Sequence, residues 1–334
     1  MGNDRRELIK LGLAGLAGIN TADALAASSS AGRVNTQAPF PSGLTYATLM
    51  QGEVATLAIR TTRGLLNMAV VERERRLGLP QTTDELIQRR GNLNALTTLT
   101  NDAKLPARYF VDAAKATFGP CVMNPDKIIC LGLNYRAHAA ESGQAAPSSP
   151  ILFNKYRTSL NAHGGTIRVS SESASKWDYE AELVIVMGRG GRNIPEAAAL
   201  DYVFGYCVGQ DFTARDLQQL TSQWMLGKCG DGWGPIGPWL VSADQVDPDN
   251  LDIQCSLNGE VRQSANTNMM IFNCRQMISY ISRHMTLSPG DVIFTGTPEG
   301  VINGYPKDKQ VWMKPGDKLV TSIEKLGEQR ISLT

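Results

Sequence analysis

The chain lacks the features that would mark a redox, zinc or nucleic-acid-binding protein. Its six cysteines include no Cys-x-x-Cys pair and only three histidines are present, which argues against a zinc ribbon or a thioredoxin-like centre. With 33 basic and 32 acidic residues, it has no broad electric field to hold nucleic acid. Beyond the first thirty residues, no hydrophobic run reaches the length of a membrane span. With 42% hydrophobic residues over 334 positions, we expect a soluble globular protein whose partners are small molecules.

The first thirty residues differ in composition from the rest. Arg5 and Arg6 precede a weakly apolar, Gly/Ala-rich segment at 11–19, and Ala24-Leu25-Ala26 offers small residues at a cleavage spacing. This order is typical of an export signal, and the arginine pair resembles a twin-arginine signal. The sequence therefore predicts a leader over 1–27 and a periplasmic mature protein with no membrane segment. The alternative is a short disordered or helical N-terminus of a cytoplasmic protein.

Residues 28–119 are predicted to form a small N-terminal α/β domain. Its clearest strands are expected at 53–60 and 64–71, where apolar residues are frequent. Helices are expected at 83–90, with Thr83 as N-cap, and at 107–117. We assign this domain no chemistry of its own.

Residues 120–334 carry short strand patterns separated by turn signals roughly every ten residues. This spacing lacks the regular strand-helix alternation of a doubly wound fold, so it predicts an α+β, β-rich domain. Strands are expected at 126–132, 183–187, 203–208, 251–257, 292–295 and 319–323, and helices at 135–142, 214–220 and 273–284.

Two glutamates stand two positions apart at the start of an apolar run. On a strand, Glu180 and Glu182 would point to the same face, and two converging carboxylates repel each other unless a divalent cation lies between them. Asp211, just after another apolar strand, is a third candidate ligand. The alternatives are a solvent-exposed edge strand for the glutamates and an ordinary helix N-cap for Asp211. The continuous apolar run at 183–186 favours a strand buried on both faces.

Four further side chains stand where chemistry is plausible. His138 and Glu141 are three apart, so on a helical turn the carboxylate could orient the imidazole as a general base; the alternative is a surface salt bridge. Lys228 lies near the start of a Gly- and Pro-rich segment at 227–238. A tightly folded backbone there would hold the Lys228 side chain in a fixed position. Thr297 lies in a turn that could present a hydroxyl to an oxyanion. For both segments the alternative is an ordinary structural turn.

Taken in order, these motifs resemble those of the fumarylacetoacetate hydrolase family, over about residues 125–325. The resemblance departs from the family pattern at Cys229-Gly230, after the lysine, and at the polar stretch 303–310. Both differences lie at positions that could contact the substrate, so they concern substrate specificity. The motifs are Lys127 to Tyr135 followed by His138 and Glu141, Asp178 to Leu183, Asp211 to Asp216, Lys228 with Asp231 and Gly237-Pro238, Asn258 to Gln263, Leu287 to Asp291, and Thr295 to Pro298.

The resemblance implies a fumarylacetoacetate hydrolase-like mixed β roll, usually a homodimer, that binds Mg²⁺, with Mn²⁺ or Ca²⁺ as alternatives. By matching position it implies three sets of residues. They are the metal ligands Glu180, Glu182 and Asp211, the catalytic residues His138, Glu141 and Lys228, and the substrate-binding residues Tyr135, Arg215, Gln218 and Thr297.

The predicted activity is metal-dependent hydrolysis of a carbon–carbon bond in a 1,3-diketo acid of the acylpyruvate type, through a metal-chelated enolate. The alternative keeps the site and changes the outcome: a decarboxylase, an isomerase or a hydratase/lyase of a related 2-oxo acid. A third hypothesis is an exported binding protein without turnover, which the His138/Glu141 pair argues against because a binder needs no water-activating base.

Overall fold

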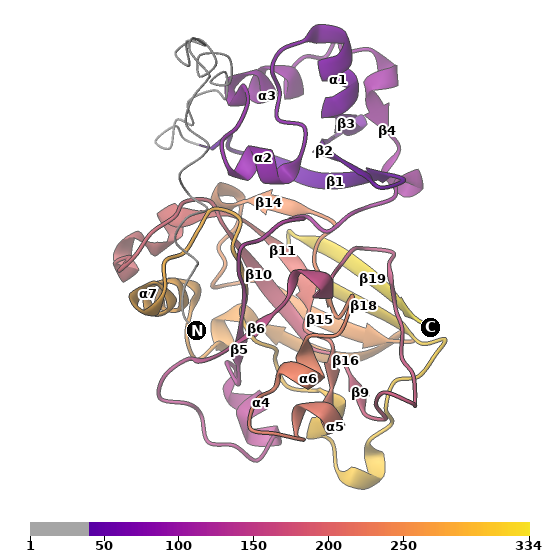
Figure 1. The fold of residues 1–334 in the computed structure, drawn as a ribbon, viewed down its shortest axis with the longest axis vertical. Coiled ribbons are helices and arrows are strands. Elements are labelled where there is room, and N and C mark those ends of the chain that lie inside the picture. Colours follow the sequence, from indigo (N-terminus) through magenta and orange to yellow (C-terminus); the bar gives the residue numbers. More distant parts are fainter. Residues whose placement is uncertain (1–39) are drawn as a thin grey trace, which may run out of the picture. The chain divides into compact units, whose positions relative to one another are not determined.

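The computed structural model describes residues 40–334, so the predicted leader at 1–27 lies outside the described residues. Most strands join one ten-stranded sheet in the order β4-β3-β2-β1-β14-β11-β10-β17-β5-β6 (Figure 1). Its neighbours are antiparallel except β17 and β5, which run parallel. The strands are β1 (Thr45–Gln51), β2 (Val54–Thr61), β3 (Gly64–Asn67), β4 (Phe110–Val111), β5 (Ile128–Gly132), β6 (Ile151–Lys155), β10 (Ala181–Met187), β11 (Val203–Gln210), β14 (Leu240–Ser242) and β17 (Val292–Phe294).

A second sheet has five strands in the order β16-β15-β18-β19-β8, and two short strand pairs complete the β structure. β15, β18 and β19 lie side by side and antiparallel, and Figure 1 shows them beside β10 and β11. These strands are β8 (Thr166–Ile167), β15 (Asp252–Leu257), β16 (Glu260–Asn266), β18 (Lys318–Ile323) and β19 (Gly327–Leu333), and the pairs are β9 (Trp177–Asp178) with β12 (Thr213–Ala214) and β7 (Leu160–Asn161) with β13 (Gly234–Pro235).

The α-helices of the described residues are short, and none is long and apolar enough to cross a lipid bilayer. The longest is α7, whose 11 residues are capped by Asn273. The helices are α1 (Met68–Arg75), α2 (Thr83–Ile87), α3 (Leu93–Thr100), α4 (Arg136–Glu141), α5 (Arg215–Gln218), α6 (Met225–Lys228) and α7 (Cys274–His284).

Strand β10 lies at the centre of the core and is buried on both faces, as its unbroken apolar run predicts. Leu183 and Ile185 belong to an apolar cluster that also holds side chains of the five-stranded sheet and α7. Val184 and Val186, on the opposite face, belong to a cluster with residues of α1, α2 and α3. The alternation follows from the two-residue period of a strand.

The first 80 described residues form β1 to β4 and α1 to α3, and β1 pairs with β14 at Thr45 and Val241. The large sheet is therefore shared by the segments on both sides of residue 119. A separate small domain at 28–119 stays a prediction.

Three local expectations in this region were wrong. The strand expected at 64–71 ends at Asn67, because the Asn67 side chain accepts the N–H groups of Ala69 and Val70 and so starts α1. The cap of α2 is Thr82, not Thr83. The helix expected at 107–117 is instead β4 between two 3₁₀ turns, because Phe110 and Val111 pair with β3.

Candidate active site

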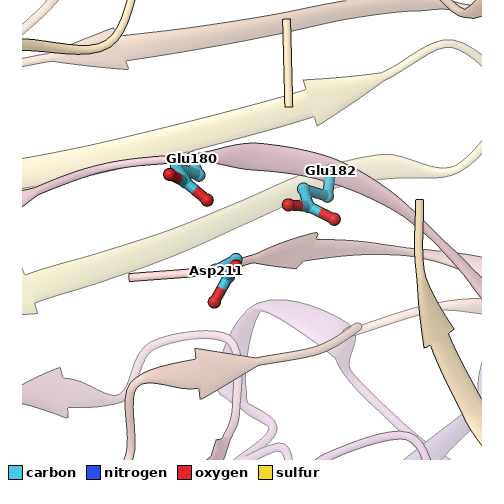
Figure 2. A group of neighbouring side chains, drawn as sticks. All are labelled: Glu180, Glu182 and Asp211. Atoms are coloured by element: carbon cyan, nitrogen blue, oxygen red, sulfur yellow. The ribbon is translucent and has the colours of Figure 1, made fainter. Parts of the chain in front are cut away.

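Three buried carboxylates meet where two neighbouring strands end. Glu180 directly precedes β10, Glu182 is its second residue, and Asp211 directly follows β11. Because β10 and β11 are antiparallel and Ala181 lies opposite Gln210, the start of one strand adjoins the end of the other. One oxygen of each carboxylate lies within 4.8 Å of the others. Figure 2 shows the three side chains as neighbours. The structure thus brings together the three predicted ligands.

Three cations surround this acidic cluster. Lys228, at the end of α6, donates from Nζ to Glu180 Oε2 (2.6 Å) and Asp211 Oδ2 (2.7 Å). Lys155 Nζ lies 2.7 Å from Asp211 Oδ1, and Arg215 Nη2 lies 2.7 Å from Glu180 Oε1. Burial alone would lower the pKa of Lys228, but Asp211 and Glu180 outweigh it and raise that pKa. Lys228 therefore stays an ammonium group and acts by its charge.

The carboxylates are unequally neutralised. Burial would raise the pKa of Glu180, but the positive charges of Lys228 and Arg215 outweigh it and lower the pKa to about 2. Glu182 forms no salt bridge with a described residue. Its Oε2 accepts the Gly296 N–H (2.7 Å), and its buried Oε1 has no hydrogen-bond partner among residues 40–334. Burial, followed by repulsion from Asp211 and Glu180, raises the pKa of Glu182 well above its ordinary value.

This cluster fits a divalent cation. Three carboxylates supply the hard oxygen ligands that Mg²⁺ and Mn²⁺ prefer, and the partnerless Oε1 of Glu182 is a buried acceptor that an ion would satisfy. The ion would be held by Glu180, Glu182 and Asp211, and it would supply the positive charge that Glu182 lacks.

A buried histidine and a partly buried glutamate on α4 form a pair. His138 Nδ1 lies 2.7 Å from Glu141 Oε1, and the other oxygen of Glu141 accepts the Gly300 N–H at 2.9 Å. His138 is only 5% exposed, so the pair is not a surface salt bridge. Glu141 fixes the ring orientation, and because a carboxylate can only accept, the tautomer with the proton on Nδ1 suits this contact and makes Nε2 the nitrogen that can act as a base.

His138, Glu180, Arg215 and Lys228 face one cavity of about 370 Å³, a size typical of small-molecule sites. Its lining includes the predicted substrate residues Arg215, Gln218 and Thr297. Arg215 Nη1 donates to Gln218 Oε1 (3.0 Å), and Thr297 Oγ1 accepts from Gln263 Nε2 (2.8 Å). His138, Lys228 and Glu180 line the same cavity.

Tyr135 is the one predicted substrate residue that the structure places away from the lining. Its ring is fully buried, and its hydroxyl has no hydrogen-bond partner among residues 40–334. Burial raises the pKa of this hydroxyl, so it stays protonated. A substrate contact by Tyr135 stays a prediction.

The comparison with known sequences identifies the catalytic region. The profile of the fumarylacetoacetate hydrolase C-terminal region matches residues 127–334, which is well over half of the chain. The chain belongs to the fumarylacetoacetate hydrolase family. The mixed, strand-rich fold agrees: a fumarylacetoacetate hydrolase from Exiguobacterium antarcticum superposes with a TM-score of 0.72 at 28% identity, covering 87% of this chain and 99% of that one.

Other relatives in the fumarylacetoacetate hydrolase family differ in their reactions. A fumarylpyruvate hydrolase from Pseudomonas aeruginosa, solved with Mn²⁺ and pyruvate, is 33% identical with a TM-score of 0.57, covering 65% of this chain and 91% of that one. A mitochondrial oxaloacetate tautomerase of Xenopus laevis is 44% identical over 62% of this chain and 65% of its own length. The family therefore consists of enzymes, while the reaction varies between its members.

Two residues of the site were missed from the sequence. Lys155, at the end of β6, is buried against Asp211 and donates to the carbonyl oxygens of Lys228 and Trp233. Asp178 is fully buried and pairs with Arg215 Nε at 2.8 Å. It also accepts the N–H groups at 302 and 303, next to the cavity residue Asn303. The alternation along β6 could have indicated Lys155, since it shares a face with Ile151 and Phe153.

Proposed function

We propose that the protein is a metal-dependent hydrolase that cleaves a carbon–carbon bond in a 1,3-diketo acid of the acylpyruvate type. The observation that carries this proposal is that His138, paired with Glu141, lines the same cavity as Lys228 and Glu180 of the acidic cluster. A base held by a carboxylate in the same cavity as a fixed cation is suited to activating water and balancing the negative charge that follows.

The substrate would bind with its carboxylate and 2-oxo oxygens toward the positively charged end of the cavity, where Lys228 and Arg215 lie. A divalent cation held by Glu180, Glu182 and Asp211 would supply Lewis acidity toward these oxygens. Mg²⁺ or Mn²⁺ is the expected ion, and the Mn²⁺ bound to the Pseudomonas aeruginosa relative supports this choice.

His138 would take a proton from water, and the hydroxide would add to the C4 carbonyl. The C3–C4 bond then breaks, its electron pair leaves with the pyruvate fragment as an enolate, and the proton on His138 returns to C3. The products are one carboxylic acid and pyruvate. Glu141 stabilises the imidazolium, and Lys228 offsets the negative charge, each without leaving its observed contacts.

A second candidate is tautomerisation of oxaloacetate, favoured by the 44% identity to the Xenopus laevis tautomerase. It needs the same base, because His138 would move one proton between C3 and the 2-oxo oxygen without attack by water.

One experiment separates the two reactions. The purified chain with Mg²⁺ or Mn²⁺ is mixed with acetylpyruvate or with oxaloacetate, and enol absorbance, pyruvate and CO₂ are followed together. Hydrolysis predicts one pyruvate per acetylpyruvate consumed and no CO₂. Enol loss from oxaloacetate without pyruvate, combined with intact acetylpyruvate, would refute hydrolysis and support the tautomerase.

A further inference from the structure

One face of strand β6 changes from charged to apolar along the cavity. Ile151, Phe153 and Lys155 all lie on this face, because they stand two positions apart along the strand, and neighbouring positions on it are about 7 Å apart. Lys155 contacts Asp211, the Phe153 ring centroid lies 5.1 Å from Lys228 Nζ, and Ile151 lies opposite Gly132 of β5. The face therefore leads from the acidic cluster, past the ammonium group, to an apolar end.

An indole ring extends this apolar end. Trp224 is the residue before α6, the helix that carries Lys228, and its ring packs edge-on against Phe153 with centroids 5.3 Å apart. A Cβ at Gly132 would lie 2.5 Å from Trp224 Cζ3, so only glycine leaves room for the ring in this position. We call Gly132, Ile151, Phe153 and Trp224 the apolar wall; all four line the cavity.

No cation among the described lining residues is available to the apolar wall. The ionisable lining residues are His138, Glu180, Arg215 and Lys228, and both permanent cations are bound to carboxylates of the acidic end. The remaining polar lining residues are neutral, namely Ser142, Gln144, Gln218, Gln219, Thr221, Thr297 and Asn303.

A substrate carboxylate placed at the wall would lose water and gain no opposite charge, which costs binding free energy. An uncharged flat or branched group would instead bury apolar area against Phe153 and Trp224.

We infer that this protein selects diketo acids whose acyl group is uncharged and apolar, and that Trp224 and Phe153 determine this specificity. The inference rests on the proposed function for the orientation of the substrate, with its 2-oxo acid end at Lys228. It excludes acyl groups that end in a second carboxylate.

The test compares three acylpyruvates with a phenyl, a methyl or a carboxyvinyl acyl substituent. Dissociation constants are measured by calorimetry with Mg²⁺ on His138→Asn, which should not turn the ligands over, and hydrolysis is measured on the unchanged chain. We expect the phenyl ligand to bind at least about tenfold more tightly than the carboxyvinyl ligand. Equal or tighter binding of the carboxyvinyl ligand would overturn the inference.

Variants of the wall give a second readout. Trp224→Ala should weaken the phenyl ligand by about tenfold or more and change the methyl ligand by less than about threefold. Trp224→Phe should restore most of the loss, which separates lost contact from misfolding. Trp224→Lys should favour the carboxyvinyl ligand, since it places a cation at the wall. Leu220→Ala is the matched control: Leu220 is exposed on the same segment and does not line the cavity.

The two hypotheses can fail separately. If no diketo acid is hydrolysed while the phenyl preference in binding persists, the proposed function is wrong and the specificity inference stands. If acetylpyruvate is hydrolysed and the carboxyvinyl ligand is preferred, the function stands and the inference is wrong. A Trp224→Ala loss that is equal for the phenyl and methyl ligands also contradicts the inference.

Discussion

The imidazole of His138 has little freedom, because Glu141 contacts both its Nδ1 and the Gly300 N–H. Replacing His138 with Asn should lower kcat by at least about 100-fold, the usual contribution of a positioned base, and Glu141→Gln should lower it less. Steady-state hydrolysis of acetylpyruvate measures both effects, and Mn²⁺ titration followed by electron paramagnetic resonance should show unchanged ion affinity.

The matched control for Glu141→Gln is Glu260→Gln, which alters an exposed glutamate paired with Arg262 on the surface. Its kcat should equal that of the unchanged chain. A parallel loss of Mn²⁺ affinity and turnover in His138→Asn would show that the histidine acts on the ion site and not as the base.

Lys155 holds a buried negative charge in place. In Lys155→Met, the buried Asp211 Oδ1 loses the cation beside it, so the free energy of unfolding should fall by about 3 kcal/mol. Urea denaturation measures this change. Lys309→Met, at an exposed lysine, should change it by less than about 0.5 kcal/mol. An unchanged midpoint in Lys155→Met would contradict the structural role.

The residues that could be found from the sequence are those with a local signal. The two-residue spacing of Glu180 and Glu182 and the three-residue spacing of His138 and Glu141 follow from strand and helix periods, and the structure has both geometries. Lys155 and Asp178 were missed because their partners, Asp211 and Arg215, lie 56 and 37 positions away in the sequence. No periodic pattern records a contact at that distance.

Among the elements, α7 has the most complete local signals. The Asn273 side chain accepts the Gln276 N–H and the Gln276 side chain accepts the Asn273 N–H, both at 3.0 Å, and its buried face carries Met277, Ile278 and Ile281. Asn273→Ala should therefore lower the free energy of unfolding by about 1 kcal/mol in urea. Asn94→Ala, at an exposed position within α3, is the control and should have little effect. Equal effects of the two substitutions would contradict the role of the cap.

The boundaries of helices and strands were harder to predict from the sequence than their types. Apolar runs located β10, β11, β15 and β18 to within two or three residues. The change from β3 to α1 was missed because every residue from Leu65 to Val71 except Asn67 is apolar, and the Asn67 cap ends the strand. The segment 107–117 has helix-forming residues, yet pairing with β3 decides its structure.

For the whole molecule, export to the periplasm is proposed from the sequence of residues 1–27, which lie outside the described residues. Replacing Arg5 and Arg6 together with lysine should keep the protein in the cytoplasm, because the twin-arginine pathway reads the arginine pair. Cell fractionation with immunoblotting measures this, and Lys10→Arg is the control. Cytoplasmic location of the unchanged chain would contradict the proposal.

The family motifs between about 125 and 325 made the catalytic fold predictable, whereas the long pairings that join the chain were not. β1 and β14 are about 195 positions apart, and nothing in either short segment specifies the other. The sequence could therefore indicate the components of the large sheet but not that one sheet runs through both halves.

The shared sheet has a consequence for truncated forms of the protein that lack the N-terminal segment. A product starting at residue 120 would leave β14 without β1, one of its two neighbouring strands, and would open to water part of the apolar cluster that Val184 and Val186 share with residues of α1 to α3. Bare backbone amides next to exposed apolar side chains favour intermolecular strand pairing. Such a fragment should collect in inclusion bodies, so residues 40–119 are best treated as scaffolding for the enzyme and not as a dispensable appendage.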